Sequence, residues 1–171
     1  MGAPSVTLRV LVGEPRELVD LQRVIEAAPG YAELVTGVPP GFADAQSTYT
    51  ALPEGKTYDD KFVYGIYLDD EMVGCVDLIR GYSDEVTAFL GLLLIGEPFQ
   101  RRGVGSAAFR AVERVVSNWG SCHRIRLSVL RAHDHAIPFW TSLGFAATGE
   151  TKPYAYGTVV SEHVLYEKWL R

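Results

Sequence analysis

Residues 100–106 (QRRGVGS) place two arginines and two glycines between an apolar run and a segment with helical periodicity. Glycine lets backbone N–H groups approach a ligand without an intervening side chain. The first turn of a helix adds N–H groups without intrahelical partners and a partial positive charge. This combination favours an anion, most often a phosphate, and the guanidinium groups of Arg101 and Arg102 would screen its charge.

Two common phosphate-binding motifs fit this segment poorly. The loop of nucleoside triphosphatases needs GxxxxGK followed by Ser or Thr, which the sequence lacks. Residues 103–108 satisfy the dinucleotide-binding pattern GxGxxG/A, but that pattern also needs an acid about 20 positions later to bind a ribose hydroxyl. The sequence has no acid between Glu113 and Asp134. The remaining interpretation is a pyrophosphate cradle flanked by arginines, as coenzyme A would need.

Hydrophobic periodicity predicts the elements that hold this junction. Strands are expected at residues 5–12, 62–68, 72–79, 87–95, 124–130, 145–152 and 159–170. Helices are expected at residues 14–28, at 103–119 and from Asp134 to Gly144, and residues 29–55 should form loops and short helices. This order predicts one α+β domain over residues 1–171, in which helices flank a single, mixed, mostly antiparallel sheet in three α/β layers.

Two motifs make the sequence resemble the GNAT superfamily of acetyl-coenzyme A-dependent N-acetyltransferases. Residues 100–105 match the family signature Q/R-x-x-G-x-G/A, and residues 136–145 (AIPFWTSLGF) are similar to its AxxFYxxxGF segment. The resemblance extends from about Phe62 to the C-terminus, with the elements in the same order. It implies the GNAT fold, in which residues 91–95 belong to a fourth strand that separates from the fifth and exposes its backbone to the pantetheine arm.

The resemblance implies acetyl-coenzyme A as the cosubstrate. Backbone N–H groups of residues 101–106 would bind its pyrophosphate, and the N–H group of Ile95 would act as an oxyanion donor to the thioester carbonyl. No metal is expected, because the cluster His133-Asp134-His135 lacks a third ligand at a clear spacing. The expected cofactor-binding residues are Leu93, Leu94, Ile95, Gln100, Arg101, Arg102, Gly103, Val104, Gly105, Ser106, His133, Phe139 and Trp140.

Acetyl transfer requires the acceptor to lose a proton, since an amine with a pKa of about 10.4 is mostly charged at neutral pH. Glu97, just beyond the separated strand, is the expected general base, and Asp77 is the alternative. Where the family commonly has a tyrosine that protonates the thiolate, this sequence has Trp140, whose indole cannot usefully give up a proton. His133, which replaces a family asparagine, and Tyr154 are therefore candidate acids, and water is another source of this proton.

The family builds its acceptor site from the first helical region and the last hairpin, which here contain several tyrosines and acids. These residues suit an amine with an apolar or aromatic body, either a small molecule or a peptide or protein amine.

Two alternatives stay open: a non-catalytic acyl-coenzyme A sensor of the same fold, which Trp140 favours, and an enzyme for a larger acyl group. Dimers through the final strands are common among relatives, so the resemblance allows a homodimer, although the sequence itself does not determine the oligomeric state. His123 and His163 are expected to be structural or exposed.

Charge and hydrophobicity argue against several function classes. The 16 Lys and Arg residues against 21 Asp and Glu residues give a net charge of −5, which does not favour a nucleic-acid-binding protein. The longest apolar run, residues 89–95, is too short to span a bilayer, and the first residues lack a signal-peptide pattern. Two cysteines without a CxxC motif predict a reducing, cytoplasmic location.

Overall fold

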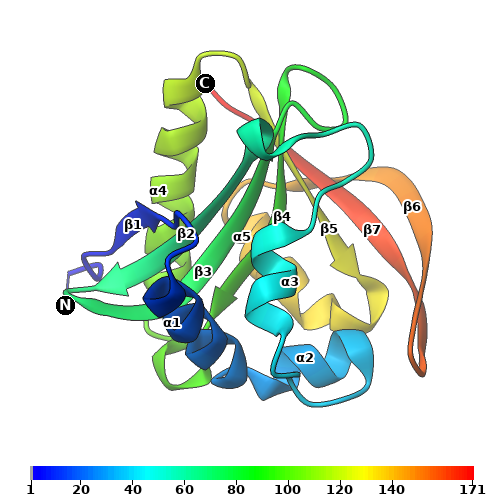
Figure 1. The fold of residues 1–171 in the computed structure, drawn as a ribbon. Coiled ribbons are helices and arrows are strands. Elements are labelled where there is room, and N and C mark those ends of the chain that lie inside the picture. The colour runs from blue at the N-terminus through cyan, green and yellow to red at the C-terminus, as the bar shows by residue number, and fades with distance from the viewer. Residues whose placement is uncertain (1) are drawn as a thin grey trace.

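The computed structural model describes residues 2–171, which form a seven-stranded sheet with helices on both faces (Figure 1). The strand order is β1-β2-β3-β4-β5-β7-β6, and every neighbouring pair is antiparallel except β4 and β5. This arrangement confirms the predicted mixed, mostly antiparallel sheet. The strands are β1 (Thr7–Val10), β2 (Lys61–Leu68), β3 (Glu71–Arg80), β4 (Thr87–Ile95), β5 (Arg124–Leu130), β6 (Ala146–Tyr156) and β7 (Val159–Trp169).

Helices cover the two faces of the sheet because successive residues of a strand point to opposite sides. Tyr64 and Ile66 of β2 pack with the apolar stripe of α4 on one face. Val63 of β2 and Cys75 of β3 pack with α1 and α3 on the other face. The α-helices are α1 (Pro15–Glu26), α2 (Pro29–Thr36), α3 (Asp44–Thr50), α4 (Val104–Trp119) and α5 (Ile137–Ser142).

Helix α4 begins at Val104, within residues 100–106, which are called the glycine-rich junction here, as predicted. Its apolar stripe includes Phe109, Val112 and Val116, all fully buried against the sheet. Burying one such side chain contributes about 1.5–3 kcal/mol, so this stripe fixes the helix on the sheet. Gly103 precedes the helix with a φ of 78°, and Gly120 ends it with a φ of 70°, a backbone conformation that favours glycine. The first turn of α4 is thereby held at the end of β4.

Strands β4 and β5 pair over a short distance and then separate. Parallel pairing joins Thr87 to Arg124, Ala88 to Ile125 and Phe89 to Arg126, whereas β4 continues to Ile95 and β5 to Leu130. Against β3, the register shifts because Asp77 pairs with Leu92 and Leu78 with Leu90, so that Gly91 is an extra residue in β4. Such a bulge bends the strand. The separation predicted from residues 91–95 is therefore present in the structure.

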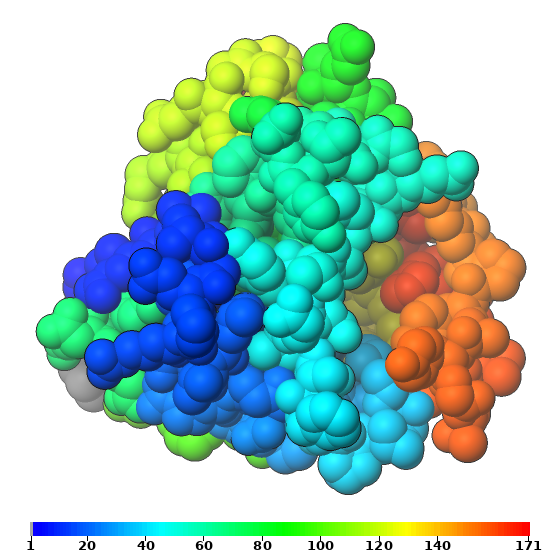
Figure 2. Space-filling view, viewed as in Figure 1, coloured from blue at the N-terminus to red at the C-terminus, as the bar shows by residue number. Residues whose placement is uncertain are grey.

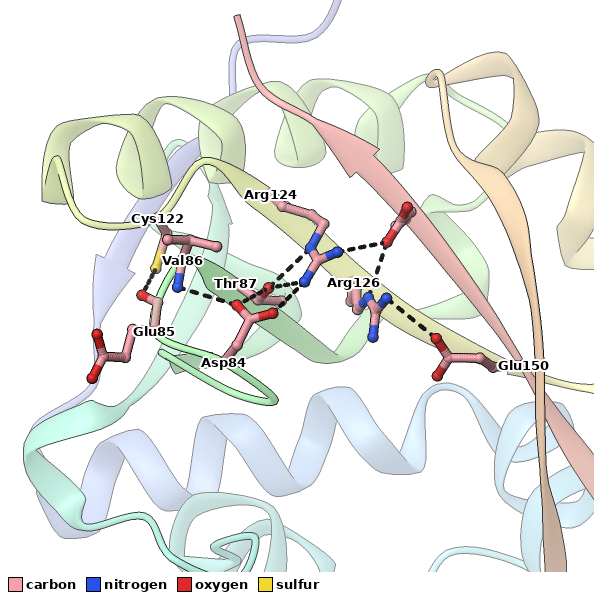
Figure 3. A network of polar contacts seen from close by, with 9 residues as sticks. Asp84, Glu85, Val86, Thr87, Cys122, Arg124, Arg126 and Glu150 are labelled. Carbon is pink, nitrogen blue, oxygen red and sulfur yellow. Dashed lines mark hydrogen bonds and ion pairs between the residues drawn. The ribbon is translucent and has the colours of Figure 1, made fainter.

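A network of ion pairs and hydrogen bonds holds β4, β5 and β7 together at the end where β4 and β5 pair (Figure 3). Arg124 donates from Nε to Thr87 Oγ1 at 3.0 Å and from Nη1 to Glu167 Oε2 at 3.1 Å, and it pairs with Asp84. Arg126 Nε donates to the same Glu167 oxygen at 3.0 Å. Because this end is fixed, the two strands can separate only toward Ile95 and Leu130.

The segment after β5 differs from its prediction. Residues Arg131–Ala136 form the 3-10 helix η3, and α5 starts only at Ile137, so the prediction of a single helix from Asp134 was wrong. The break lies at His133, whose φ of −104° and ψ of 35° are not helical. Ala136, not Asp134, is the N-cap of α5, and proline is tolerated in the first turn that follows. Strand β6 also extends to Tyr156, beyond its expected end at residue 152.

Candidate active site

The separation of β4 and β5 opens a cavity of about 610 Å³, called the interstrand cavity here. Its walls come from residues 90–95 of β4, residues 127–130 of β5, and Phe139 and Trp140 of α5. It extends to the glycine-rich junction before α4. Eleven of the thirteen residues expected to bind the cofactor line it: Leu93, Leu94, Ile95, Gln100, Arg101, Gly103, Gly105, Ser106, His133, Phe139 and Trp140.

The other two expected cofactor-binding residues, Arg102 and Val104, lie outside this lining. Arg102 Nη1 donates to the carbonyl oxygen of Pro98 at 3.4 Å, and its guanidinium lies 5.7 Å from the ring centre of Phe99. Val104 is 2% exposed and packs in the core between α4 and the sheet. Their side chains hold the junction in place and do not face the cavity.

The glycine-rich junction is tied to β4 and to α5. Gln100 Nε2 donates to the carbonyl oxygen of Ile95 at 2.8 Å, which fixes the turn against the end of the strand. A Cβ atom on Gly105 would lie 3.3 Å from the ring of Phe139 and 3.8 Å from Ile95 Cγ1, so a larger residue would push α4 and α5 apart. The first turn of α4, which contains no acid, thus faces the cavity at close range.

The residues of the interstrand cavity fit a ligand with an anionic end and a long, mostly neutral arm. At the junction, the start of α4 presents N–H groups and a partial positive charge, and Arg101 lies beside them in the lining. Further along, aliphatic side chains of β4 and β5 form the walls. An acyl-coenzyme A has this distribution of charge, with its phosphates at one end and the thioester at the other.

A second cavity of about 410 Å³, the sheet-face cavity, lies on the face covered by α1 and α3. Figure 2 shows it as a hollow between the segment around α3 and strand β6, with β5 and β7 at its floor. Most of its lining is apolar or aromatic, including Leu52, Tyr82, Phe89 and Leu165. This lining suits the apolar body of a small molecule.

The two cavities meet at three residues that line both: Gly91 of β4, Ser128 of β5 and His163 of β7. Gly91 is the bulge residue, and a Cβ atom there would lie 3.2 Å from Asp77 Oδ2. A side chain at this position would therefore crowd the Asp77 carboxylate beside the point where the two cavities share their lining. A ligand in the interstrand cavity and one in the sheet-face cavity would approach each other at this point.

Asp77 is the acid in the lining of the sheet-face cavity. Its Oδ1 atom lies 2.9 Å from Nζ of Lys61, whose side chain is 2% exposed. Burial raises the pKa of Asp77, and the ammonium of Lys61 opposes that shift. Because Lys61 neutralises most of this carboxylate, the cavity offers little net negative charge to a ligand.

His163, which the sequence predicts to be structural or exposed, lines both cavities. The imidazole is half-buried, and its Nδ1 atom is buried without a hydrogen-bond partner among the described residues. Burial lowers the pKa of His163, and the ammonium of Lys152, opposite it on β6, lowers it further. Val164 packs on the core, so strand alternation indicates that the neighbouring His163 points to the other face of the sheet. The sequence does not indicate that β7 pairs with β5, and this pairing brings His163 to the cavities.

His133 lies in the interstrand cavity, at the kink in η3. Its ring packs edge-to-face on Tyr31 at a centroid distance of 5.8 Å and lies 4.1 Å from the ring of His135. Burial lowers the pKa of His133, the neighbouring His135 lowers it further, and Asp134 opposes both. Its Nδ1 atom is also buried and finds no hydrogen-bond partner in residues 2–171. This environment therefore favours the uncharged form of His133.

The other two predicted catalytic residues lie outside the lining of both cavities. Glu97 Oε1 accepts a hydrogen bond from the backbone N–H of Gly30 at 3.0 Å, in the first turn of α2. Tyr154 donates from its hydroxyl to the carbonyl oxygen of Val35, near the end of the same helix. Burial raises the pKa of Tyr154. The structure thus places both side chains as contacts to α2, and it does not bring them together with His133.

Two properties of residues 2–171 bear on metal binding and membranes. No group of three or more His, Cys, Asp or Glu side chains in that range could hold a metal ion. No helix in that range is both long enough and apolar enough to cross a membrane.

The chain is similar to known acetyltransferases in sequence and in fold. It is 26% identical over 110 residues to the spermine/spermidine N(1)-acetyltransferase of Bacillus subtilis (strain 168), covering 61% of this chain and 72% of that protein. The crystal structure of an acetyltransferase from Thermus thermophilus superposes with a TM-score of 0.76 at 24% identity, covering 99% of this chain and 100% of that one. A GNAT family acetyltransferase from Elizabethkingia anophelis with acetyl-CoA bound superposes with a TM-score of 0.64 at 13% identity, covering 96% and 98% of the two chains.

The family model for the acetyltransferase (GNAT) family matches residues 30–145, which is more than half of the chain. The match includes the glycine-rich junction, the separated strands and α5, which together form the interstrand cavity. The chain therefore belongs to the GNAT family of acetyltransferases.

Proposed function

We propose that this protein is an acetyl-coenzyme A-dependent N-acetyltransferase whose acceptor is a primary amine that attacks the thioester directly in a ternary complex. The observation that carries the proposal is the meeting of two cavities at Gly91, Ser128 and His163. One cavity leads to a phosphate-binding junction and the other opens on the opposite side of the bulge. Two substrates bound in this way would place their reacting ends together without a covalent enzyme intermediate.

The proposed cosubstrate supplies an activated acetyl group as a thioester. Backbone N–H groups from Arg101 to Ser106 hold its pyrophosphate at the start of α4. Residues 93–95 of β4 offer backbone groups to the arm, because β5 no longer pairs with them. Phe139 and Trp140 close the cavity from the side of α5. The N–H group of Ile95 is the proposed donor to the thioester carbonyl.

Protonation of the thiolate has two proposed routes. His133 lines the cavity in surroundings that favour its uncharged form, and we assign it the role of hydrogen-bonding the arm or of carrying a proton to the thiolate. A thiol with a pKa near 8.5 is also a fair leaving group when only water is present. Glu97 as the base and Tyr154 as an acid would each require the side chain to leave its contact with α2. Their replacement by Gln and Phe tests these two roles.

The proposed acceptor is an amine with a single positive charge on an apolar or aromatic body. The sheet-face cavity is walled by side chains such as Phe89 and Leu165, and its carboxylate, Asp77, is already paired with Lys61. Lys152 also lines this cavity. A polyamine carries several positive charges and would meet the ammonium of Lys152, while the carboxylate in this lining is already paired with Lys61, so the activity named for the Bacillus subtilis relative is not the one we expect. A peptide or protein amine that presents one such side chain belongs to the same class.

The test is the rate of thiol release from acetyl-coenzyme A with 2-phenylethylamine and with spermidine, at equal concentrations and constant ionic strength. The proposal predicts amine-dependent release, with a kcat/KM at least tenfold higher for 2-phenylethylamine. Faster turnover of spermidine would contradict the proposed acceptor class but not the proposed acetyltransferase activity.

Two further experiments test the remaining proposals. Sedimentation of the same preparation tests the proposed homodimer, and fractionation of cells that express the protein tests its proposed cytoplasmic location.

The second candidate function is a non-catalytic acyl-coenzyme A sensor. Trp140 favours it, because an indole stands where the family commonly has a proton-donating phenol. Trp140 packs edge-to-face on Phe109, Phe139 and Phe145 at centroid distances of 6.0, 4.9 and 5.4 Å, so it also serves as a rigid wall. Tight binding of acetyl-coenzyme A without thiol release for any amine would favour the sensor.

A further inference from the structure

We infer that His163 is a catalytic residue of the proposed transferase, and that its Nε2 atom accepts the proton which the attacking amine must lose. The inference rests on the proposed function and names its general base. Three residues line both cavities, and of Gly91, Ser128 and His163 only the histidine titrates near neutral pH. It therefore stands where an amine from one cavity would meet a thioester from the other.

The surroundings of the imidazole decide which nitrogen can act. Nδ1 is buried and His163 lines both cavities, so we assign the reaction to the other ring nitrogen, Nε2. The ring of Tyr154 packs edge-to-face on the imidazole at a centroid distance of 4.8 Å. Tyr154 is itself anchored by its hydrogen bond to Val35 of α2. This chain of contacts restrains the His163 ring where the two cavities share their lining, as a positioned base requires.

The charge of the site keeps this imidazole in its basic, neutral form. A base at Nε2 carries its own proton on Nδ1, so the Nδ1–H group lacks an acceptor among the described residues in both the neutral and the protonated ring. The protonated ring is disfavoured by its burial and by the ammonium of Lys152 on the paired strand. Asp77, across the sheet-face cavity, is compensated by Lys61 and gives His163 little stabilisation as a cation. The titratable and charged groups that face His163 or line its two cavities are Lys152, Tyr154, Asp77, Tyr82, Tyr31, Arg101, His133 and His135.

The proposed step conserves atoms and charge. The amine arrives as an ammonium ion, and His163 takes one proton from it and passes that proton to solvent. The nitrogen lone pair then forms a bond to the carbonyl carbon, and the carbon–sulfur bond breaks with its electron pair on sulfur. The second proton leaves the nitrogen for His163 and ends on the thiolate. One ammonium ion and one thioester thus give one amide, one thiol and one released proton.

The competing base is Glu97, whose carboxylate accepts a hydrogen bond from Gly30 at the start of α2. The two assignments predict opposite results for His163→Asn and Glu97→Gln. A glutamine at position 97 can still accept the Gly30 hydrogen bond through its amide oxygen, so the fold of α2 is expected to remain. An asparagine at position 163 keeps a polar side chain in β7 and removes the titrating group.

The experiment measures kcat and KM from pH 5 to 9 for wild type, His163→Asn, Glu97→Gln and the control His123→Asn, which alters an exposed histidine at the start of β5. Wild-type kcat/KM should fall on the acidic side with an apparent pKa below the ordinary 6.5 of histidine. His163→Asn should lower kcat by a factor of about 10² to 10⁴ and remove this acidic limb. Its KM for acetyl-coenzyme A should stay within about threefold of wild type. Glu97→Gln and His123→Asn should both keep the decrease of kcat/KM at acidic pH.

A second variant keeps the test decisive if His163→Asn does not fold. Lys152→Gln removes the ammonium that lowers the pKa of His163, so the acidic limb should move to higher pH. An unmoved limb in Lys152→Gln, or a limb retained in folded His163→Asn, would overturn the assignment. Loss of activity in Glu97→Gln with an active His163→Asn would transfer the role to Glu97. A wild type that releases no thiol with any amine contradicts the proposed function, a result distinct from a failure of His163.

Discussion

Ser106 shows how one side chain can separate ligand binding from helix stability. It is the third residue of α4 and lines the interstrand cavity. Ser106→Glu places a carboxylate at the start of the helix, where it stabilises the helix by about 0.3–1 kcal/mol. The same carboxylate repels a pyrophosphate. We predict an unchanged or raised Tm together with a dissociation constant for acetyl-coenzyme A that rises at least tenfold, as measured by calorimetry.

Ser106→Gln, of similar size but without charge, is the matched control and should weaken binding by less than about threefold. Equal losses in the two variants would mean that bulk, and not charge, matters at this position. That outcome would contradict the assignment of an anion to the start of α4.

The sequence predicts the binding role of a residue best where backbone N–H groups, and not side chains, would contact the ligand. The glycine-rich junction follows from its residue types, because glycine and a helix start expose N–H groups wherever the rest of the fold lies. The directions of Glu97 and His163 depend on contacts with α2 and β6, which are distant in sequence. Local patterns do not contain that information, so the sequence alone predicts neither direction.

The network around Arg124 holds three strands together and can be tested as a unit. The Arg124 side chain is 12% exposed and contacts groups on β4, β7 and the loop before β4. Arg124→Met removes the charged donor and leaves the buried Thr87 with fewer partners. We predict a loss of about 1–3 kcal/mol in the free energy of unfolding, measured by urea denaturation.

Arg9→Met is the control, because Arg9 pairs with Asp70 at the surface and their side chains are 47% and 98% exposed. Surface pairs contribute about 0–1 kcal/mol, so this variant should lose less stability than Arg124→Met. Similar losses in both variants would show that the network does not hold the paired end of β4 and β5.

Most strands and α4 were predictable because their apolar residues repeat with the period of a strand or with that of a helix, and not with both. The segment from Arg131 to Ser142 was not, because its 3-10 turn and short helix share an apolar pattern that one continuous helix would also satisfy. At the break, the ring of His133 contacts Tyr31 of α2 and His135, and the contact with α2 joins segments that are distant in sequence. The prediction that β4 separates from β5 came from the resemblance to a family and not from hydrophobic periodicity.

The stability of the whole molecule should depend on pH through His133 and His163. Burial lowers the pKa of both imidazoles below 6.5, so below that pH the unfolded chain binds more protons than the folded one. Stability is therefore predicted to fall as the pH decreases from about 7 to 5. Asp60 and Asp84, whose pKa values are lowered from 3.8 by hydrogen bonds and arginines or lysines, lose their contribution only at more acidic pH.

Urea denaturation at intervals between pH 7 and 5 measures this dependence, and the His133→Asn/His163→Asn double variant is the comparison. The double variant should show a flatter profile than wild type over that range. An identical slope in both proteins would mean that the two imidazoles are solvated like those of the unfolded chain.

Two cavities meeting at one point is the central property of this molecule, and calorimetry followed by a thiol-release assay tests it most directly. The purified protein is titrated with acetyl-coenzyme A and with NADP, and thiol release is then followed with 2-phenylethylamine. The account predicts binding of acetyl-coenzyme A, no comparable binding of NADP, and thiol release that depends on the amine. Failure to bind acetyl-coenzyme A in the folded protein would contradict the assignment of the interstrand cavity and, with it, the proposed function.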